Sequence, residues 1–498
     1  MNAHAGDGPL DDATLASAME VLTHARLSWR GKVVGTVAAC DPVPWKSQLN
    51  YRECFVRDFA VSAAAFLAAG EHETVGNFLT TVATLQADAD GDAGLTPAPG
   101  LMPASFAVMR SPDGGERLVA DFGQRAIGRV APVDSALWWL WTLRAHARAG
   151  GDPELHRQPT VAEAVRRVLR TYLQPQFEML PSLLVPDGAS MIDRRLGVYG
   201  HPLDVQVLFW AALRSARELL SADDPWREPV ERRLVALGRH LRRDYWLDRA
   251  RIEAIRRLPV EEFGEDALNP WNLHPDAVPV WTMAWLSEGG GYFAGNVGPA
   301  RLDPRFFALG NLLAVASGLA TEAQATALFD LVERHEGDLL GVGGMKLVYP
   351  PVEGRDWALL TGSDPKNVPW AYHNGGSWPM LLWPLTSAAR RAGRGALAGR
   401  VLQRSGPRLR QDDWPEYYDG PYGGLIGGRS RLRQTWSAAA VLAAAALRAD
   451  AAPSTTEGVA ADPYAFEPDA ELEAAIAAAS DELGTSPRGS QAHDDASS

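Results

Sequence analysis

The sequence predicts an all-α fold, a toroid of six helical hairpins. Helical periodicity dominates the chain, and about twelve such segments can pair as six consecutive hairpins. No sequence repeat of fixed period is present, which argues against an open solenoid of the same hairpins. In a toroid every second helix lines the inside. The candidate helices lie at about 11–29, 52–69, 72–88, 133–149, 161–173, 202–220, 226–243, 302–318, 321–335, 374–392, 394–404 and 433–449.

The segment 202–220 illustrates the pattern behind each candidate helix. Pro202 stands where the first turn of a helix tolerates proline, and Asp204 adds negative charge near the N-terminal end. Arg214 and Glu218 face away from the apolar side. The apolar residues that share one face are Leu208, Ala212, Ala216 and Leu219.

The remaining segments fit around this helical frame. Short strands are expected at 32–38 and 346–349, in connecting loops, and the segment from about 244 to 300 is expected to be an excursion between two helices. Residues 485–498 are rich in Ser, Asp, Gly and Gln. We therefore divide the chain into an N-terminal helical segment that is part of the barrel (1–30), the barrel itself (31–450) and a largely disordered polar tail (451–498).

Composition excludes several classes of protein. The net charge is -13, from 48 basic and 61 acidic residues, and no strongly basic stretch accompanies it, so neither nucleic acid nor a membrane surface is an expected partner. No apolar run reaches the roughly 20 residues of a membrane span, and the N-terminus lacks the pattern of a signal peptide. Cys40 and Cys54 make no disulfide framework, which suits a reducing cytoplasm.

Polar and aromatic residues concentrate in the loops that precede alternate helices. In a toroid these loops emerge on one rim, so six of them would converge on one pocket. The 17 tryptophans of the chain can fill a core or stack on the faces of sugars. The six loops are 51–58, 128–134, 191–202, 294–299, 370–379 and 414–420.

Carboxylates in or near these loops favour glycoside cleavage. That reaction needs an acid to protonate the leaving oxygen and a second carboxylate to act on water or on the anomeric carbon. Asp193 has apolar neighbours that would favour a proton donor, although an ion pair with an adjacent Arg would oppose this. The candidates are Asp58, Asp134, Asp187, Asp193, Asp303, Asp364, Asp412, Asp413, Glu416 and Asp419.

The surroundings of Glu416 and the pair Arg57-Asp58 can each be explained by a structural role or by a functional one. Glu416 lies among Trp414, Pro415, Tyr417 and Tyr418, so rigid neighbours would hold its carboxylate, but a loop residue that satisfies backbone donors would look the same. Arg57 and Asp58 can grip two sugar hydroxyls, or they can form an ion pair at a helix start.

The sequence contains no complete motif for binding a metal or a cofactor. The run Asp88, Asp90, Asp92 begins like a calcium loop, but Ala93 and Pro99 replace its required glycine and glutamate. No Cys/His spacing suits zinc, the glycine runs lack the Lys-Ser/Thr of a phosphate loop, and no Gly-x-Ser-x-Gly is present. We expect neither a metal nor an organic cofactor.

From about Gly31 to Arg448 the chain resembles the alkaline/neutral invertases, glycoside hydrolase family 100. The motifs that carry the resemblance are long and specific. They are YRECFVRDF (51–59), DFGQRAIGRVAPVDSALWW (121–139), LLVPDGASMIDRRLGVYGHPLDVQVLF (183–209), GYFAGNVGPARLDPRFFALGNLLA (291–314), TGSDPKNVPWAYHNGGSWP (361–379) and WPEYYDG (414–420).

The resemblance implies an (α/α)6 barrel that hydrolyses sucrose to glucose and fructose with inversion. It implies a cytoplasmic homo-oligomer, such as a hexamer, without a cofactor. The family's general acid falls on Asp193 and its general base on Glu416. Loop position and likeness together place the sugar-binding residues at Arg57, Asp58, Asp134, His201, Gln206, Tyr292, His373, Asn374, Trp378 and Gln434.

Four alternatives compete with this interpretation. An inverting glucosidase for trehalose or a glucosyl-polyol would share the glucose subsite. An inverting phosphorylase on a similar toroid would not need the base Glu416. A catalytically silent sugar-binding protein would lack one of the two carboxylates, and both are present. A terpene-cyclase-like barrel would need an Asp-rich motif at a helix end, and the one Asp cluster of that kind lies in a Gly/Ala/Pro loop.

Overall fold

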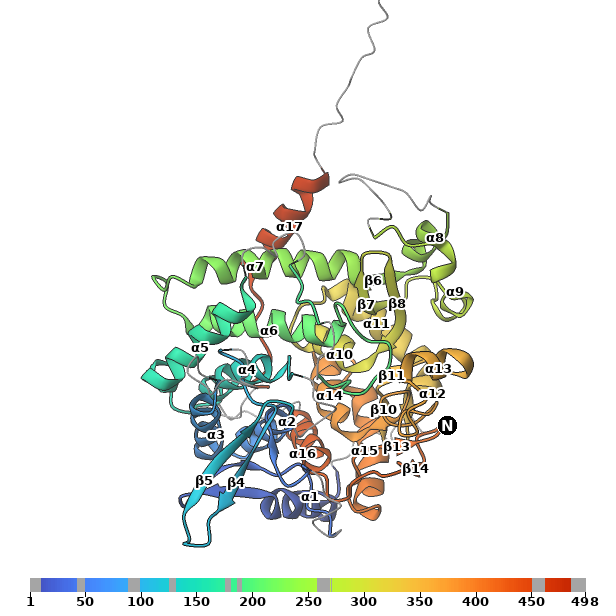
Figure 1. The fold of residues 1–498 in the computed structure, drawn as a ribbon. Helices are drawn as coiled ribbons and strands as arrows, with labels where there is room; N and C mark the ends of the chain where they lie inside the picture. Colours follow the sequence, from blue (N-terminus) through green and yellow to red (C-terminus); the bar gives the residue numbers. More distant parts are fainter. Residues whose placement is uncertain are drawn as a thin grey trace, which may run out of the picture.

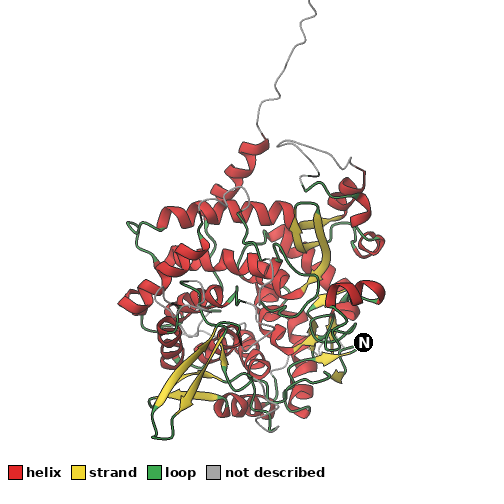
Figure 2. Ribbon diagram, in the orientation of Figure 1, coloured by secondary structure: helices red, strands yellow, loops and turns green. Residues whose placement is uncertain are grey.

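The computed structural model describes most of the chain and is mainly helical (Figure 1, Figure 2). Each of the twelve candidate helices corresponds to a helix in the structure. Residues 186–189, which include the candidate Asp187, and 88–98, which include the rejected calcium loop, lie outside the described residues. The described ranges are 10–42, 50–87, 99–124, 131–174, 181–185, 190–257, 269, 271–449 and 462–484.

Six helices contact one another in a closed cycle. Each packs against the next, and the last packs against the first. They correspond to the second, fourth, sixth, eighth, tenth and twelfth candidates, so alternate helices form the inner ring. In order around the ring they are α2 (Val56–Ala68), α4 (Ser135–Arg148), α6 (Leu203–Leu219), α10 (Ala308–Ala316), α14 (Leu382–Arg391) and α16 (Thr435–Ala449).

Six further helices pack outside this ring. Inner helices such as α6 are buried on nearly all sides, whereas the outer helix α5 buries one stripe that includes Val161, Val165 and Val168. Side-chain caps fix several outer helix starts: Asp11 accepts from the Thr14 amide, and Thr321 with Gln324 forms a capping box. The outer helices are α1 (Asp12–His24), α3 (His72–Thr84), α5 (Pro159–Tyr172), α7 (Arg227–His240), α11 (Glu322–Arg334) and α15 (Gly395–Gln411).

Four small sheets correct the all-α prediction. The first is β1 (Arg26–Trp29) with β2 (Lys32–Thr36), and the second is β3 (Cys54–Phe55), β4 (Ser105–Arg110) and β5 (Glu116–Asp121). The third contains β6 (Trp246–Asp248), β7 (Gly291–Gly298), β8 (Arg301–Phe307) and β11 (Val348–Tyr349). The fourth contains β9 (Leu340–Gly341), β10 (Gly344–Lys346), β12 (Ser377–Trp378), β13 (Tyr418–Asp419) and β14 (Leu425–Ile426).

These strands lie in the connections between helices, where helical periodicity has nothing to detect. The candidate helix 302–318 shows most clearly where the prediction and the structure differ. Its first part is strand β8, and the helix begins only at Ala308. Pro304 cannot donate a backbone hydrogen bond, and β8 pairs with the buried strand β7. Antiparallel pairing therefore overrides the helical pattern in that segment.

The excursion at 244–300 links the third sheet to short helices. It contributes β6 and β7, and around them lie η5 (Leu241–Tyr245), α8 (Arg249–Arg257), η6 (Pro275–Ala277) and α9 (Val280–Trp285). The other short elements are η3 (Leu155–Arg157), α12 (Glu336–Leu339), α13 (Gly354–Thr361) and η7 (Pro379–Leu381). None of the described helices has the length and apolar character needed to cross a membrane.

Residues 462–484 differ from the largely disordered tail that the sequence predicts. Tyr464 is buried and its hydroxyl donates to the Ala60 carbonyl of α2 at 2.9 Å, while Trp141 of α4 donates to the Tyr464 carbonyl at 3.0 Å. The guanidinium groups of Arg144 and Arg214 lie over the Phe466 ring at 4.2 and 4.4 Å. Helix α17 (Ala470–Gly484) then packs against α7 (Figure 1). Large aromatic side chains therefore anchor this segment across several inner helices.

Candidate active site

A pocket of about 770 Å³ lies among the loops that lead into the inner helices. Arg57 and Asp58 reach it from the first turn of α2, and Gln434 and Trp436 reach it from the start of α16. The loop 191–199 and helix α13 with the residues that follow it form much of the remaining wall, and Tyr51 and Glu416 also line it. Its volume falls within the range of roughly 300–1,000 Å³ that is usual for small-molecule sites.

Asp193 stands in this pocket in a dry and charged setting. Its side chain is 11% exposed, with Oδ2 3.7 Å from the Arg57 guanidinium and Oδ1 3.7 Å from Nδ1 of His373. Burial raises the pKa of Asp193 to about 6, although Arg57 and Lys366 oppose the shift. Burial also holds the pKa of His373 well below its usual range, so the imidazole is neutral. The carboxyl group of Asp193 is thus set up to carry a proton closer to neutral pH than an exposed aspartate would.

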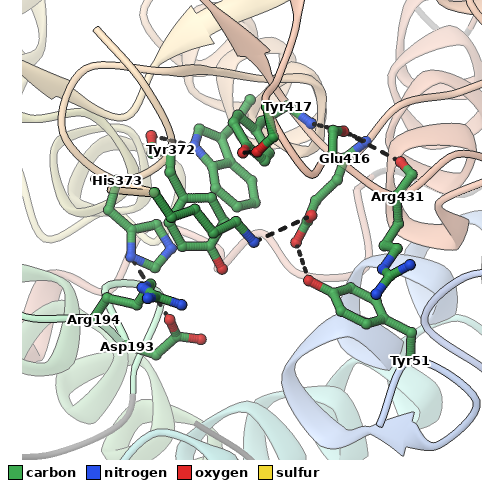
Figure 3. A network of polar contacts seen from close by, with 12 residues as sticks. Tyr51, Asp193, Arg194, Tyr372, His373, Glu416, Tyr417 and Arg431 are labelled. Carbon is green, nitrogen blue, oxygen red and sulfur yellow. Dashed lines mark hydrogen bonds and ion pairs between the residues drawn. The ribbon is translucent and has the colours of Figure 1, made fainter. Parts of the chain in front are cut away.

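Glu416 occupies a different environment. Its backbone amide donates to the Arg431 carbonyl at 2.8 Å, and its Oε1 accepts a hydrogen bond of 3.0 Å from the Tyr51 hydroxyl. Oε2 is buried, no described residue donates a hydrogen bond to it, and the Lys366 ammonium lies 3.9 Å away. Figure 3 shows Asp193 and Glu416 on opposite sides of the same space. One oxygen of Glu416 therefore has a hydrogen-bond donor in the protein, and the other has none among the described residues.

The loop that carries Glu416 is held in place by its neighbours. Asp413 and Trp414 adopt left-handed backbone conformations, with φ of 58° and 57°, where the chain leaves α15. The Trp414 indole donates to Ser17 Oγ at 3.0 Å, and the Tyr417 hydroxyl donates to the Gly428 carbonyl. These contacts limit the positions that the carboxylate can take.

Arg57 and Asp134 form a buried ion pair beneath the pocket. Arg57 Nη1 donates to Asp134 Oδ2 at 2.9 Å, and Asp134 stands at the N-terminal end of α4. Asp134 does not line the cavity, and its contact is with Arg57. Asp58 does line the cavity, and loss of solvent raises its pKa to about 7 against the opposing charge of Arg57.

Several buried polar atoms of the pocket wall have no hydrogen-bond partner among the described residues. Folded proteins satisfy most such atoms, so a group of them on residues that line one cavity is compatible with a polar ligand there. Within the described part of the chain, no three His, Cys, Asp or Glu side chains gather as a metal site would require. The unpartnered atoms include Asn50 Nδ2, Arg57 Nε, His373 Nδ1, Glu416 Oε2, Gln434 Oε1 and Trp436 Nε1.

Comparison with known proteins identifies the family. The profile of the alkaline and neutral invertases matches residues 18–451. Neutral/alkaline invertase 1, mitochondrial, from Oryza sativa subsp. japonica is 46% identical over 434 residues, which cover 85% of this chain and 69% of that protein. Probable alkaline/neutral invertase F from Arabidopsis thaliana is 45% identical over 434 residues, 86% of this chain and 87% of that protein.

The chain belongs to the alkaline and neutral invertase family. It is therefore a glycoside hydrolase. A solved structure of the GH63 mannosylglycerate hydrolase from Thermus thermophilus, with Tris and D-glycerate, has a TM-score of 0.52 at 14% identity, over 86% of this chain and 99% of that one. At that level of identity the likeness concerns the fold alone, and it extends along nearly the whole of both chains.

In this invertase-family chain seven of the twelve predicted site residues line one pocket. Six of them come from four of the six loops expected to converge, and the seventh, Gln434, directly precedes α16. The loops 128–134 and 294–299 contribute no lining residue among the described positions. These seven are Arg57, Asp58, Asp193, His373, Trp378, Glu416 and Gln434.

The other five predicted residues do not line the pocket, and each of them forms a hydrogen bond within the protein. Besides Asp134, His201 Nδ1 lies 3.0 Å from Ser182 Oγ, and Gln206 bonds both the amide and the carbonyl of Leu183. The Tyr292 hydroxyl donates to the Pro304 carbonyl. Asn374 accepts from the Val352 amide and donates to the carbonyls of Val352 and Asn367.

Sequence reasoning missed two residues that touch the site directly, Tyr51 and Lys366. Tyr51 opens the first motif, but its contact with Glu416 joins positions far apart in the chain. A signal for Lys366 was present, since lysine is rare here and one of only four lysines falls inside a long motif. Arg194 and Asp364 form a bidentate ion pair in the wall, with distances of 2.6 and 2.9 Å, that was not foreseen either.

Proposed function

We propose that this protein hydrolyses sucrose to glucose and fructose with inversion at the anomeric carbon of glucose. The observation that carries the proposal is the pair of buried carboxyl groups, Asp193 and Glu416, which face one pocket from opposite sides in different surroundings (Figure 3). Membership of the alkaline and neutral invertase family supports the choice of sucrose.

In the proposed reaction Asp193 is the general acid and Glu416 the general base. Asp193 gives its proton to the bridging oxygen, the bond from that oxygen to the glucose anomeric carbon breaks, and fructose leaves as the neutral alcohol. A water attacks the same carbon from the other face, and Glu416 takes a proton from that water. The raised pKa of Asp193, about 6, and its burial support the role of proton donor. The unpartnered Oε2 of Glu416 supports the role of base.

The space between the two carboxyl groups follows from this assignment. An inverting enzyme must fit a water between the base and the sugar, so its carboxyl groups stand about 6.5–9.5 Å apart, against about 5–5.5 Å in a retaining enzyme. Arg57 and Asp58 are proposed to grip the glucose, with His373, Trp378 and Gln434 completing the wall around it. Asp134 supports this grip through its 2.9 Å hydrogen bond with Arg57.

We further propose that the architecture is an (α/α)6 barrel with the site at one end. The closed cycle of α2, α4, α6, α10, α14 and α16, with six helices packed outside it, supports this description. The N-terminal ends of α2 and α16 carry pocket residues, which supports an active site at that end of the ring.

Compartment and assembly stay predictions. Relatives of this chain carry names that include cytosolic, mitochondrial and chloroplastic invertases, so the family occurs in more than one compartment. A cytoplasmic homo-oligomer, such as a hexamer, is proposed for this chain on family likeness. Light scattering of the purified protein, which gives the molar mass in solution, tests the oligomer.

Sugar release by purified protein tests the function. Sucrose should yield glucose and fructose, whereas trehalose and maltose should hardly be cleaved. Proton NMR in the first minutes should find the β-anomer of glucose in excess, because inversion at an α-linkage gives that product. Comparable turnover of trehalose would overturn the claim for sucrose but not for hydrolysis, and α-glucose as first product would overturn the roles of Asp193 and Glu416.

A further inference from the structure

We infer that Lys366 holds the attacking water against Glu416. The inference rests on the proposed function, because it assigns a role only if Glu416 is the base. Lys366 lies between α13 and α14 in the motif TGSDPKNVPWAYHNGGSWP (361–379), and its side chain is 10% exposed. It lines the same pocket as Asp193 and Glu416.

The ammonium group of Lys366 is held in place but lacks a hydrogen-bond acceptor. Nζ lies 3.7 Å from the centre of the Tyr372 ring and 5.5 Å from that of Tyr417, so two aromatic faces stabilise the cation. Its nearest carboxylate atom is Glu416 Oε2 at 3.9 Å, too long for a hydrogen bond, and no described residue accepts one from Nζ. A largely buried ammonium with three donors needs an acceptor, and here the pocket has to supply it.

Glu416 Oε2 lacks a hydrogen-bond donor, just as the Lys366 ammonium lacks an acceptor. It is a buried acceptor to which no described residue donates a hydrogen bond, whereas Oε1 is already occupied by Tyr51. A water molecule both accepts and donates, so one water in contact with Nζ and Oε2 would satisfy both groups. A separation of 3.9 Å between these atoms leaves room for a single oxygen that lies about 2.8 Å from each.

A sugar hydroxyl is the other species that could bridge the two atoms, and the reaction argues against it. Under the proposed roles Oε2 is the atom that takes the proton, because Oε1 is engaged by Tyr51. A hydroxyl of the sugar in that position would exclude the water that must attack. The bridging oxygen is therefore the reacting water, and Lys366 fixes its position through one donated hydrogen bond.

The test compares turnover with sugar binding. Lys366→Met should lower kcat for sucrose by roughly 10- to 100-fold, since a positioned water is lost, while KM changes little. Lys366→Arg, which keeps a cation and donors, should recover part of the activity. Lys32→Met is the matched control, because Lys32 is exposed on β2 and does not line the pocket, and it should behave as wild type.

Lys366 also influences the carboxyl group of Asp193. A second substrate distinguishes a direct effect of Lys366 on the water from an indirect effect through Asp193. α-Glucosyl fluoride needs no proton on its leaving group but still needs the water. Lys366→Met should therefore lose turnover on sucrose and on the fluoride alike, whereas Asp193→Asn should lose it mainly on sucrose.

Sucrose affinity in an inactive background decides between the water and a sugar hydroxyl. Glu416→Gln binds without turnover, and adding Lys366→Met should leave the dissociation constant from calorimetry within about twofold. A tenfold weaker affinity would overturn the inference and assign Lys366 to the sugar, and an unchanged kcat in the single variant would overturn it as well. If wild type itself neither binds nor cleaves sucrose, the proposed function fails, and the inference falls with it.

Discussion

The hydroxyl of Tyr51 donates a 3.0 Å hydrogen bond to Oε1 of Glu416, although 365 residues separate the two in the chain. Tyr51 precedes the first helix of the inner ring and Glu416 precedes the last, so the contact forms where the ring closes. Burial, with the charge of Glu416, raises the pKa of Tyr51 well above its usual value, which keeps the phenol protonated as a donor. The carboxylate of Glu416, the proposed base, is thus oriented by a residue that precedes the first helix of the inner ring.

Tyr51→Phe should lower kcat for sucrose while KM changes little. A hydrogen bond to a charged group contributes about 1.5–3 kcal/mol, which corresponds to roughly 10- to 100-fold in rate if the bond matters fully in the transition state. Steady-state kinetics with Tyr422→Phe as control would measure it, because Tyr422 is 80% exposed. Wild-type kcat in Tyr51→Phe would mean that the contact is structural only.

Asp193→Asn should distinguish the acid from the other carboxylates. An amide cannot protonate the leaving oxygen, so sucrose hydrolysis should fall by roughly 10²- to 10⁴-fold, the usual contribution of a general acid. Hydrolysis of α-glucosyl fluoride should fall far less, because fluoride leaves without a proton. Equal losses on both substrates would contradict the assignment of Asp193, and selective loss on sucrose in Asp58→Asn would transfer the role to Asp58.

Activity should fall as pH rises through the pKa of Asp193. The acid works only when protonated, and its pKa of about 6 lies well above that of an exposed aspartate. The alkaline limb of kcat/KM against pH should therefore begin above about pH 6 in the free enzyme. An alkaline limb with unchanged position in Asp193→Glu and in variants of Arg57 would indicate that another group sets it.

Asp58→Asn should lose sugar binding and gain stability at alkaline pH. The loss in kcat/KM should be roughly 2–4 kcal/mol if Asp58 accepts from a glucose hydroxyl in the transition state. Its folded pKa, about 7, lies above the ordinary value of 3.8, so its contribution to stability is present at low pH and is lost as pH rises toward 7. Thermal melts at about pH 5 and about pH 8 should find a larger gain in Tm at the higher pH, because the loss begins above the unfolded pKa and is complete only above the folded one.

Gln206→Leu should lower stability and leave sugar recognition intact. The side-chain amide forms hydrogen bonds with both backbone groups of Leu183. Its loss leaves two polar groups without partners, each of which lowers the free energy of unfolding by about 1–3 kcal/mol. Tm should fall, while KM for sucrose measured well below Tm should stay near that of wild type. A specific rise in KM at unchanged Tm would return Gln206 to the glucose subsite.

Tyr464→Ala should destabilise the whole barrel. Replacing a large buried aromatic residue by alanine costs about 3–5 kcal/mol, and here the hydroxyl contacts to Ala60 and Thr142 are lost as well. Calorimetry should find a lower Tm, with unchanged kcat per folded molecule at low temperature. Tyr422→Ala, on an exposed side chain, is the control, and equal Tm values in the two variants would exclude an anchoring role for residues 462–484.

The sequence alone determined the helical frame. Apolar spacing located the twelve inner and outer helices, because a helix that packs on one or more faces leaves a period of 3.6 in its own residues. It did not locate α17. The alternation of inner and outer helices could also be predicted, because consecutive hairpins place every second helix on the same side. Motif and loop position predicted four residues that line the pocket. They lie in the polar loops before the inner helices or in the first turn of one, and they are Asp193, Glu416, Arg57 and Asp58.

Only the tertiary structure determined the small sheets and the packing of residues 462–484, because neither leaves a period in the sequence. The four small sheets pair strands of two to eight residues, too short for a period to stand out, and their stability comes from partners distant in the chain. The tail 462–484 carries few large apolar residues, yet Tyr464 and Phe466 pack against the inner helices α2, α4 and α6, which only the folded ring brings together.

The same reason separates the predicted residues that line the pocket from those that do not. Gln206 and Asn374 have side chains able to bind a sugar, but the folded backbone beside them offers donors and acceptors first. Tyr51 and Lys366 acquire their roles only from proximity to Glu416, at 3.0 and 3.9 Å. Sequence specifies which polar groups are available, and the fold determines which of them remain unsatisfied and face the pocket.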